Sequence, residues 1–156
     1  LAKGEWVLPV KIFARFVIWG VIGLWITYMM KTFASGIAVL TAGGLLPLSG
    51  RVLFDKFLSA FYTSATMNLS FGPTFMALHK CSDRYLELKH SGKATSVNSV
   101  VTSIDWTAFA SFTLFKTVPL FWIPAHTLTF MLPAEYQVIV AAALSIALGV
   151  ILSLKK

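Results

Sequence analysis

Long stretches without a charged residue constrain this chain more than any other feature of its sequence. Three of them lie at residues 16–30, 32–50 and 117–125. A soluble domain needs a polar exterior, and these stretches provide none. Hydrophobic residues make up 57% of the 156 residues and charged residues 12%, a more apolar balance than that of an ordinary soluble domain. We therefore expect an integral membrane protein in which lipid surrounds these stretches.

The lengths of the apolar segments predict several membrane crossings. A helix needs roughly 20 apolar residues to cross a bilayer core, and five segments approach that length: 12–30, 32–48, 57–78, 104–123 and 136–154. The predicted fold class is all-α, a bundle of about four transmembrane helices plus an apolar N-terminal helix. We expect residues 1–31 to form that N-terminal helix, interfacial or tilted, and residues 32–156 to form the four-helix transmembrane domain.

The positions of the basic residues favour four crossings over five, because Lys and Arg accumulate in loops on one side of a membrane. With four crossings only Arg51 and Lys56 face one side. The other side then holds Lys3, Lys11, Arg15, Lys31, Lys80, Arg84, Lys89, Lys93, Lys155 and Lys156. A fifth crossing by residues 12–30 would remove most of this bias. Four crossings are therefore predicted.

Several classes of function are excluded by composition. The basic residues behind the net charge of +7 flank apolar runs instead of forming one basic face, so no nucleic-acid partner is expected. Cys81 is the single cysteine, which excludes an internal disulfide and a cysteine-built metal site. No phosphate loop, HExxH, nucleophile elbow or EF-hand is present, and the three histidines are scattered. We expect no enzymatic activity, no cofactor and no metal.

Charged and ionisable residues crowd the end of the third segment. Helical spacings of three and four residues place opposite charges side by side there, among His79, Lys80, Asp83, Arg84 and Glu87. One interpretation is a helix end that carries many charged side chains without a further role. The other is a mouth or gate that meets a charged solute.

Two further charges lie within the fourth segment, and a histidine follows it. Asp105 and Lys116 are eleven residues apart, too far to pair on an ideal helix. A charge deep in a bilayer costs about 3 kcal/mol, so Lys116 should snorkel, find a partner or line a wet cavity. His126 lies between Pro124 and Pro133, where interrupted backbone hydrogen bonding indicates a broken helix and a place for binding.

Small polar and small apolar residues suggest how the helices pack. The third segment carries Tyr62, Thr63, Ser64, Thr66, Asn68 and Ser70. These side chains suit hydrogen bonds to neighbouring helices, which we favour, or a wet pore. The second segment spaces Ser35, Ala38, Ala42 and Gly43 as a close-packing face, within the chain in preference to a dimer.

Four motifs occur in one order along the chain: LTAGGLLPLSG, FGPTFMALHKCSDRYL, DW and FWIPAHTLTFMLPAEYQ. In these motifs, over roughly residues 35–153, the chain resembles the peroxisomal membrane protein two and Mpv-seventeen family. The most specific match is Gly72-Pro73 followed by Lys80 and Asp83-Arg84. The resemblance also assigns structural roles to Thr41, Gly43, Trp122, Pro124 and Pro133. The chain departs from the family pattern at several positions, Ser49 and Gly50 among them.

The resemblance implies four transmembrane helices with both termini on one side and a pore-like role. It also implies a location in the mitochondrial inner membrane or another organelle membrane. A bacterial plasma membrane is the alternative location. The leading hypothesis is a channel-like protein that passes small polar solutes or ions. Its pore or gate candidates are His79, Lys80, Asp83, Arg84, Asp105, Lys116 and His126.

The alternative hypothesis is a non-catalytic accessory subunit of a larger membrane complex, because the chain is small and lacks catalytic groups. The expected partners are the lipid bilayer together with a homo-oligomer or other membrane subunits. An intramembrane enzyme using His79 or His126 is disfavoured, since no nucleophile or metal set accompanies either histidine.

Overall fold

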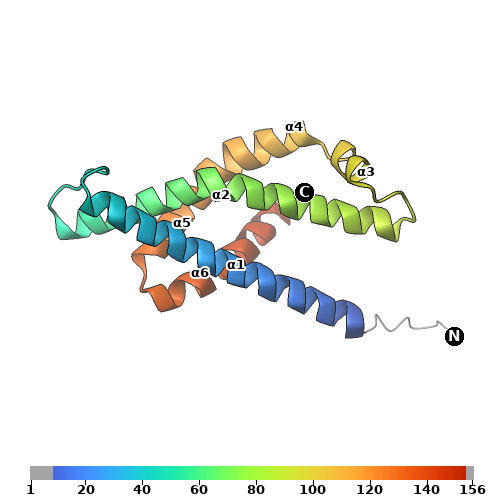
Figure 1. Cartoon of the computed structure of the whole chain (residues 1–156), viewed down its shortest axis with the longest axis horizontal. Coiled ribbons are helices and arrows are strands. Elements are labelled where there is room, and N and C mark those ends of the chain that lie inside the picture. Colours follow the sequence, from blue (N-terminus) through green and yellow to red (C-terminus); the bar gives the residue numbers. More distant parts are fainter. Residues whose placement is uncertain (1–8, 154–156) are drawn as a thin grey trace.

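The computed structural model describes residues 9–153, and all the regular structure in that range is helical (Figure 1). The predicted all-α fold class is confirmed. The elements in chain order are α1 (Pro9–Ala42), α2 (Val52–His90), α3 (Val97–Thr102), α4 (Trp106–Ala108), η1 (Phe109–Trp122), α5 (Ile123–Met131) and α6 (Ala134–Ser153). Three of the basic residues assigned to one side, Lys3, Lys155 and Lys156, lie outside the described residues.

The helix α1 joins two segments that the sequence separates. It runs for 34 residues and passes through Lys31 without interruption, so no element boundary falls at residue 31. Lysine is a good helix former, and no proline lies near it to end the helix. At about 1.5 Å per residue, α1 is long enough to exceed the thickness of a bilayer core. Lys31 therefore lies inside one helix that contains residues of both predicted segments.

The end of α1 is a turn that requires glycine. Gly44 has φ 74°, in the left-handed region. Its N–H donates to the Thr41 carbonyl at 3.1 Å, and the Leu45 N–H donates to the Leu40 carbonyl at 3.0 Å. This is a Schellman cap. The resemblance assigned a structural role to Gly43, and no turn was predicted within the segment 32–48. The helix ends at Ala42, and the left-handed conformation belongs to Gly44.

The elements α4, η1 and α5 form one continuous helical run. Within it η1 is a 14-residue π-helix, and the Thr117 hydroxyl donates to the Phe112 carbonyl five residues back at 3.0 Å. Pro124 lies in the first turn of α5 and does not break the run. The run ends at Met131, because the residue before Pro133 is held in an extended conformation.

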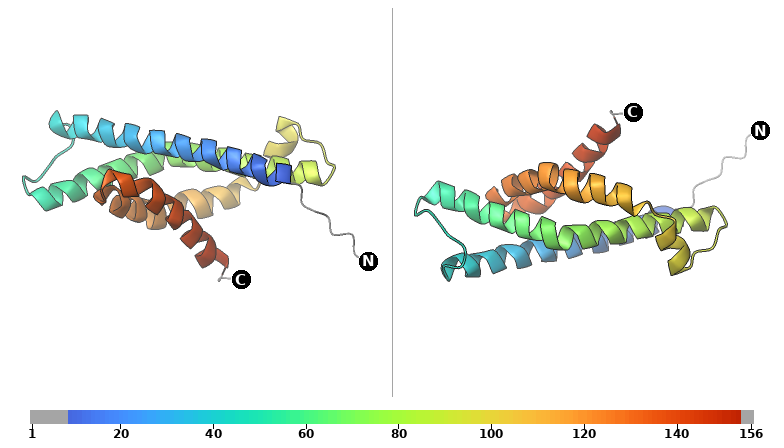
Figure 2. Two further views of the ribbon diagram at one scale, coloured as in Figure 1. Left: turned by 90° about the horizontal axis from the view of Figure 1, so that it is seen from below. Right: turned by 90° about the horizontal axis from the view of Figure 1, so that it is seen from above.

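The long helix α2 is the centre of the packing. It contacts α1, α3, η1 and α5, while α6 packs on α5. Figures 1 and 2 show α1 and α2 side by side, with α3 across the far end of α2. A small core cluster forms from Met30, Met67 and Ala141, one residue each from α1, α2 and α6. Near the end of α2, Leu88 packs with Val100 and Ile104 and holds α3 in place.

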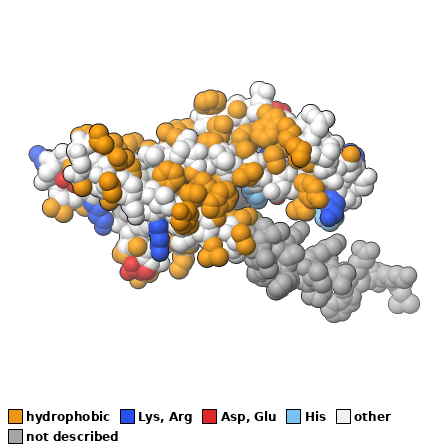
Figure 3. Space-filling view, viewed as in Figure 1, with side chains coloured by type: hydrophobic (Ala, Val, Ile, Leu, Met, Phe, Trp, Pro, Cys, Tyr) orange, Lys and Arg blue, Asp and Glu red, His pale blue; other side chains and the backbone are white. Residues whose placement is uncertain are grey.

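Two helical runs, Gly20–Ala42 and Trp106–Met131, are long and apolar enough to cross a membrane. Only 11% and 6% of the apolar stretches in these two runs are buried inside the protein, whereas the core helix of a soluble protein would be mostly buried. Large apolar side chains such as Leu24, Phe115 and Leu120 are exposed, and hydrophobic side chains cover much of the face in Figure 3. The number of crossings beyond these two runs stays a prediction.

Candidate functional site

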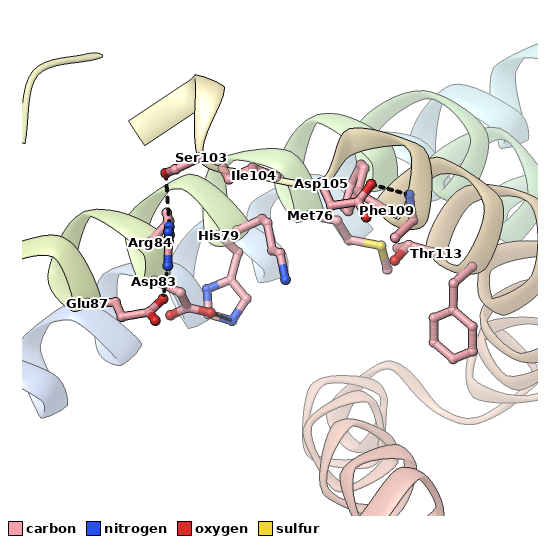
Figure 4. A pocket seen from close by; sticks show the side chains of 13 residues that line it. Met76, His79, Asp83, Arg84, Glu87, Ser103, Ile104, Asp105, Phe109 and Thr113 are labelled. Atoms are coloured by element: carbon pink, nitrogen blue, oxygen red, sulfur yellow. Dashed lines mark hydrogen bonds and ion pairs between the residues drawn. The ribbon is translucent and has the colours of Figure 1, made fainter. Parts of the chain in front are cut away.

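An open groove of about 590 Å³ lies between the second half of α2 and the beginning of the α4–η1–α5 run. We call it the charged groove (Figure 4). Five of the seven pore or gate candidates line it: His79, Lys80, Asp83, Arg84 and Asp105. The tertiary structure thus brings Asp105 to a cluster that lies some twenty residues earlier in the chain. Lys116 and His126 do not line this groove.

Arg84 connects the two walls of the charged groove. Its Nη1 donates to Glu87 Oε2 at 2.7 Å, and its Nε donates to Ser103 Oγ at 2.9 Å (Figure 4). Glu87 belongs to the same helix, but Ser103 precedes α4, so the second bond ties α2 to the following segment. Ser103 was not among the residues predicted from the sequence, since nothing in its local pattern indicates a partner nineteen residues away.

His79 and Asp83 form a ridge beside the charged groove. His79 Nε2 lies 3.7 Å from Asp83 Oδ2, and the His79 ring stacks on Phe75 with 6.5 Å between centroids. Both residues also line a second groove on the other side of α2. The spacing of four residues predicted this pair correctly.

Asp105 has a structural role in addition to its place in the groove. Its Oδ1 accepts a hydrogen bond from the Ala108 N–H at 2.8 Å and caps the start of α4. Asp105 therefore lies at a helix end and not deep within an apolar helix. Lys116 is exposed on η1, within the apolar run.

Lys80 differs from its charged neighbours in the groove. Arg84 is bonded to Glu87, and His79 is paired with Asp83. Among the residues that the structure describes, no hydrogen bond or ion pair engages the exposed Lys80 ammonium. An ammonium without a protein partner is available to an anion that enters the groove.

His126 belongs to a separate, buried cluster where α2 crosses α5. The Asn68 Nδ2 lies 3.0 Å from His126 Nδ1 and donates to the Ser64 carbonyl at 2.8 Å. The Ser64 hydroxyl donates to the Ile123 carbonyl at 2.7 Å. Ser64 and Asn68 are 0% and 3% exposed, so these bonds replace water. For these two residues the favoured interpretation, hydrogen bonding between helices, is confirmed.

The residues around this Asn68–His126 cluster close the interface further. The Trp122 ring stacks on His126 with 5.1 Å between centroids. Thr127 and Thr129 are buried and donate to carbonyls of their own run, at 2.7 Å and 2.9 Å. A β-carbon on Gly72 would lie 3.9 Å from Asn68 Oδ1, an ordinary contact distance. The cluster therefore joins two helices.

Within the described part of the chain, no group of three or more His, Cys, Asp or Glu side chains is placed to hold a metal ion. Cys81 is a half-buried free thiol. No protein-family model, curated protein or solved structure matches the chain, so the family resemblance seen in its motifs stays a prediction.

Proposed function

We propose that this chain is a non-catalytic, channel-like membrane protein that passes small polar solutes or ions, with the charged groove as the mouth of the path. The observation that carries the proposal is the groove itself. Six ionisable side chains, the five candidates and Glu87, line one open cavity in a chain whose helices otherwise expose many large apolar side chains. Ionisable side chains of a membrane protein that line a cavity are candidates for a solute pathway.

The setting of the groove supports a membrane location. Two helical runs have the length and apolar character of membrane spans. The family resemblance favours an organelle membrane, the mitochondrial inner membrane first, and a bacterial plasma membrane as the alternative.

The charges in the groove favour anions. Glu87 is bonded by Arg84, Asp83 is paired with His79, and Asp105 accepts the Ala108 N–H, whereas Lys80 has none of these contacts. An entering anion meets an unpartnered ammonium, while an entering cation competes with existing contacts of the carboxylates. We therefore expect anions to pass more readily than cations of the same size.

The path beyond the mouth follows η1. In a helix with i to i+5 hydrogen bonds, residues four or five apart share a face, so Lys116 lies on the same face as Phe112, which lines the groove. The Asn68–His126 cluster seals the alternative route between α2 and α5. The outer face of η1 needs another wall, and a second copy of the chain would provide it.

The test is solute flux through purified protein in liposomes, with Lys80→Gln compared against Lys56→Gln. Lys56 is an exposed lysine at the other end of α2, so the control makes the same charge change outside the groove. We expect Lys80→Gln to lower anion flux and the preference for anions over cations, and Lys56→Gln to leave both unchanged. Equal flux in the two variants would contradict the assignment of the mouth.

The second candidate function is an accessory subunit of a larger membrane complex. The observation that favours it is the open packing of α1, whose apolar residues Val21, Leu24 and Val39 are more than half exposed and available to another subunit. Absence of flux from correctly inserted protein, together with stable co-purification of other subunits in mild detergent, would select this alternative.

A further inference from the structure

A second groove, of about 960 Å³, lies among α1, the second half of α2 and α3. We call it the apolar groove. Its walls include Ile22 from α1, Leu78 and Leu86 from α2, and Val97 and Val101 from α3. The volume is near the upper end of the range for small-molecule sites, roughly 300–1,000 Å³. It is large enough for a ligand.

Aromatic side chains build one wall of the apolar groove. Trp25 packs edge-on against Phe75, with 5.7 Å between centroids, and against Phe71 at 5.1 Å. Across the groove, α3 is anchored because Val100 packs on Leu88. Both walls are therefore fixed by contacts within the chain, and the groove does not depend on a ligand for its shape.

The polar and ionisable side chains that line the apolar groove are those of His79, Ser82, Asp83, Tyr85 and Thr95. The Lys89 ammonium lies 5.9 Å from the centroid of the Tyr85 ring and so stands beside this polar lining. The surrounding segment, residues 79–93, contains four Lys or Arg residues and two acidic residues. One of the acidic residues, Glu87, is already bonded to Arg84. Lys80 and Arg84 line the charged groove, and Asp83, which lines the apolar groove, is paired with His79. The cation beside this polar lining is therefore Lys89.

We propose that the apolar groove binds one anionic glycerophospholipid, with an acyl chain against Trp25, Phe75 and Leu78 and the phosphate beside Lys89. The groove lies where the apolar part of α2 changes into its charged part, the depth at which a lipid changes from chain to headgroup. Basic residues next to an apolar helix attract anionic headgroups. This arrangement matches an anionic lipid at both of its ends.

This lipid site is independent of solute passage, because it lies on the opposite side of the His79–Asp83 ridge from the charged groove. If the protein binds the lipid but does not conduct, the proposed function is wrong and this inference stands. If the protein conducts but does not select the lipid, this inference is wrong and the proposed function stands.

Native mass spectrometry of the detergent-purified full chain tests the proposal. The probes are phosphatidylglycerol and phosphatidylcholine with identical oleoyl chains, and the variants are Lys89→Gln and the control Lys56→Gln. We expect the unmodified chain to retain phosphatidylglycerol in preference, and Lys89→Gln to lower that retention about fivefold. Lys56→Gln should behave like the unmodified chain. Equal retention of the two lipids, or no effect of Lys89→Gln, would overturn the proposal.

A second measurement locates the bound lipid without any substitution. Cys81 is the single cysteine of the sequence and lines the apolar groove. We expect phosphatidylglycerol to slow the alkylation of its thiol by a water-soluble maleimide more than phosphatidylcholine does. An alkylation rate that is the same with both lipids would place the lipid elsewhere and overturn the inference.

Discussion

Two polar regions of the same helix, α2, differ in almost every physical respect. The Asn68–His126 cluster lies where α2 crosses α5, and its polar groups are bonded across the interface. Ser64 and Asn68 in this cluster are almost fully buried. The charged groove lies farther along α2, is open, and leaves the Lys80 ammonium without a partner among the described residues. The first region joins helices, and the second is available to a solute.

The difference shows that polarity within an apolar helix does not by itself indicate a pore. A buried amide or hydroxyl must be hydrogen-bonded, and Ser64 and Asn68 meet this need within the protein. An exposed charge is under no such constraint. Burial, not residue type, separates the structural polar groups of α2 from the candidate functional ones.

The largest effect is expected from Asn68→Ala. The substitution removes the amide that contacts His126 and Ser64, so buried polar groups lose a partner. We expect the free energy of unfolding to fall by about 2 kcal/mol. Reversible unfolding in mild detergent, followed by circular dichroism, measures the change.

The matched control is Ser70→Ala, two residues farther along the same helix. The Ser70 hydroxyl is exposed and bonds only the Thr66 carbonyl of its own helix. Its loss should change stability by less than ~0.5 kcal/mol. Equal stabilities of the two variants would remove the distinction between the buried cluster and exposed polar residues.

A smaller effect is expected at Asp105, which takes part in the groove and also caps α4. Asp105→Ala removes the acceptor for the Ala108 N–H and should lower the free energy of unfolding by about 1 kcal/mol. Asp105→Asn keeps an acceptor while removing the charge, so it should preserve stability and shift the ratio of anion to cation flux. The comparison of thermal unfolding with liposome flux separates the two roles. Equal destabilisation by both substitutions would argue against the cap.

The smallest effect on stability is expected from Asp55→Asn, at the other end of α2 beside the turn from α1. The Ser49 hydroxyl and the Ser49 N–H both donate to Asp55 Oδ1, at 2.7 Å and 2.6 Å. The hydroxyl bond is the larger cause, and together they lower the pKa of Asp55 below its ordinary value of 3.8. Because the pKa of Asp55 is lower in the folded state than in the unfolded state, its ionised carboxylate stabilises the fold at pH values above the unfolded-state pKa. This contribution is lost as the pH falls through the folded-state pKa.

The measurement is the melting temperature of the unmodified chain minus that of Asp55→Asn, taken as a function of pH. The difference should be small, constant well above pH 3.8, and should shrink as the pH falls below that value. A difference that persists unchanged into strong acid would assign the effect to packing and not to the carboxylate.

Much of the local structure was predictable, because it depends on neighbours in the sequence. The helical segments, the His79–Asp83 pair and the break before Pro133 follow from rules of local spacing. The end of α1 at Ala42 and the left-handed turn at Gly44 were missed, because the apolar run continues to residue 48 without a charge. The sequence was divided at residue 31 because a charge ends the apolar run there, whereas α1 runs through Lys31 as one helix.

The candidate site was predictable only in part. The sequence placed His79, Lys80, Asp83 and Arg84 together, since one helix carries all four. It assigned His126 to the same set, but His126 packs against Asn68 in a buried interface. The polar run of α2 left open which of its side chains face another helix, and this depends on how α2 and α5 cross.

The sequence by itself determined an apolar, all-helical chain with a charged cluster at the end of one segment. Hydrophobic content, helical spacing and proline act over a few residues and need no partner. The tertiary structure alone decided that Asp105 and Ser103 meet the charged cluster, that Asn68 meets His126, and that a separate apolar groove opens beside Trp25. These contacts join residues distant in the chain, and only the packing of whole helices fixes which side chains are buried and which stay open.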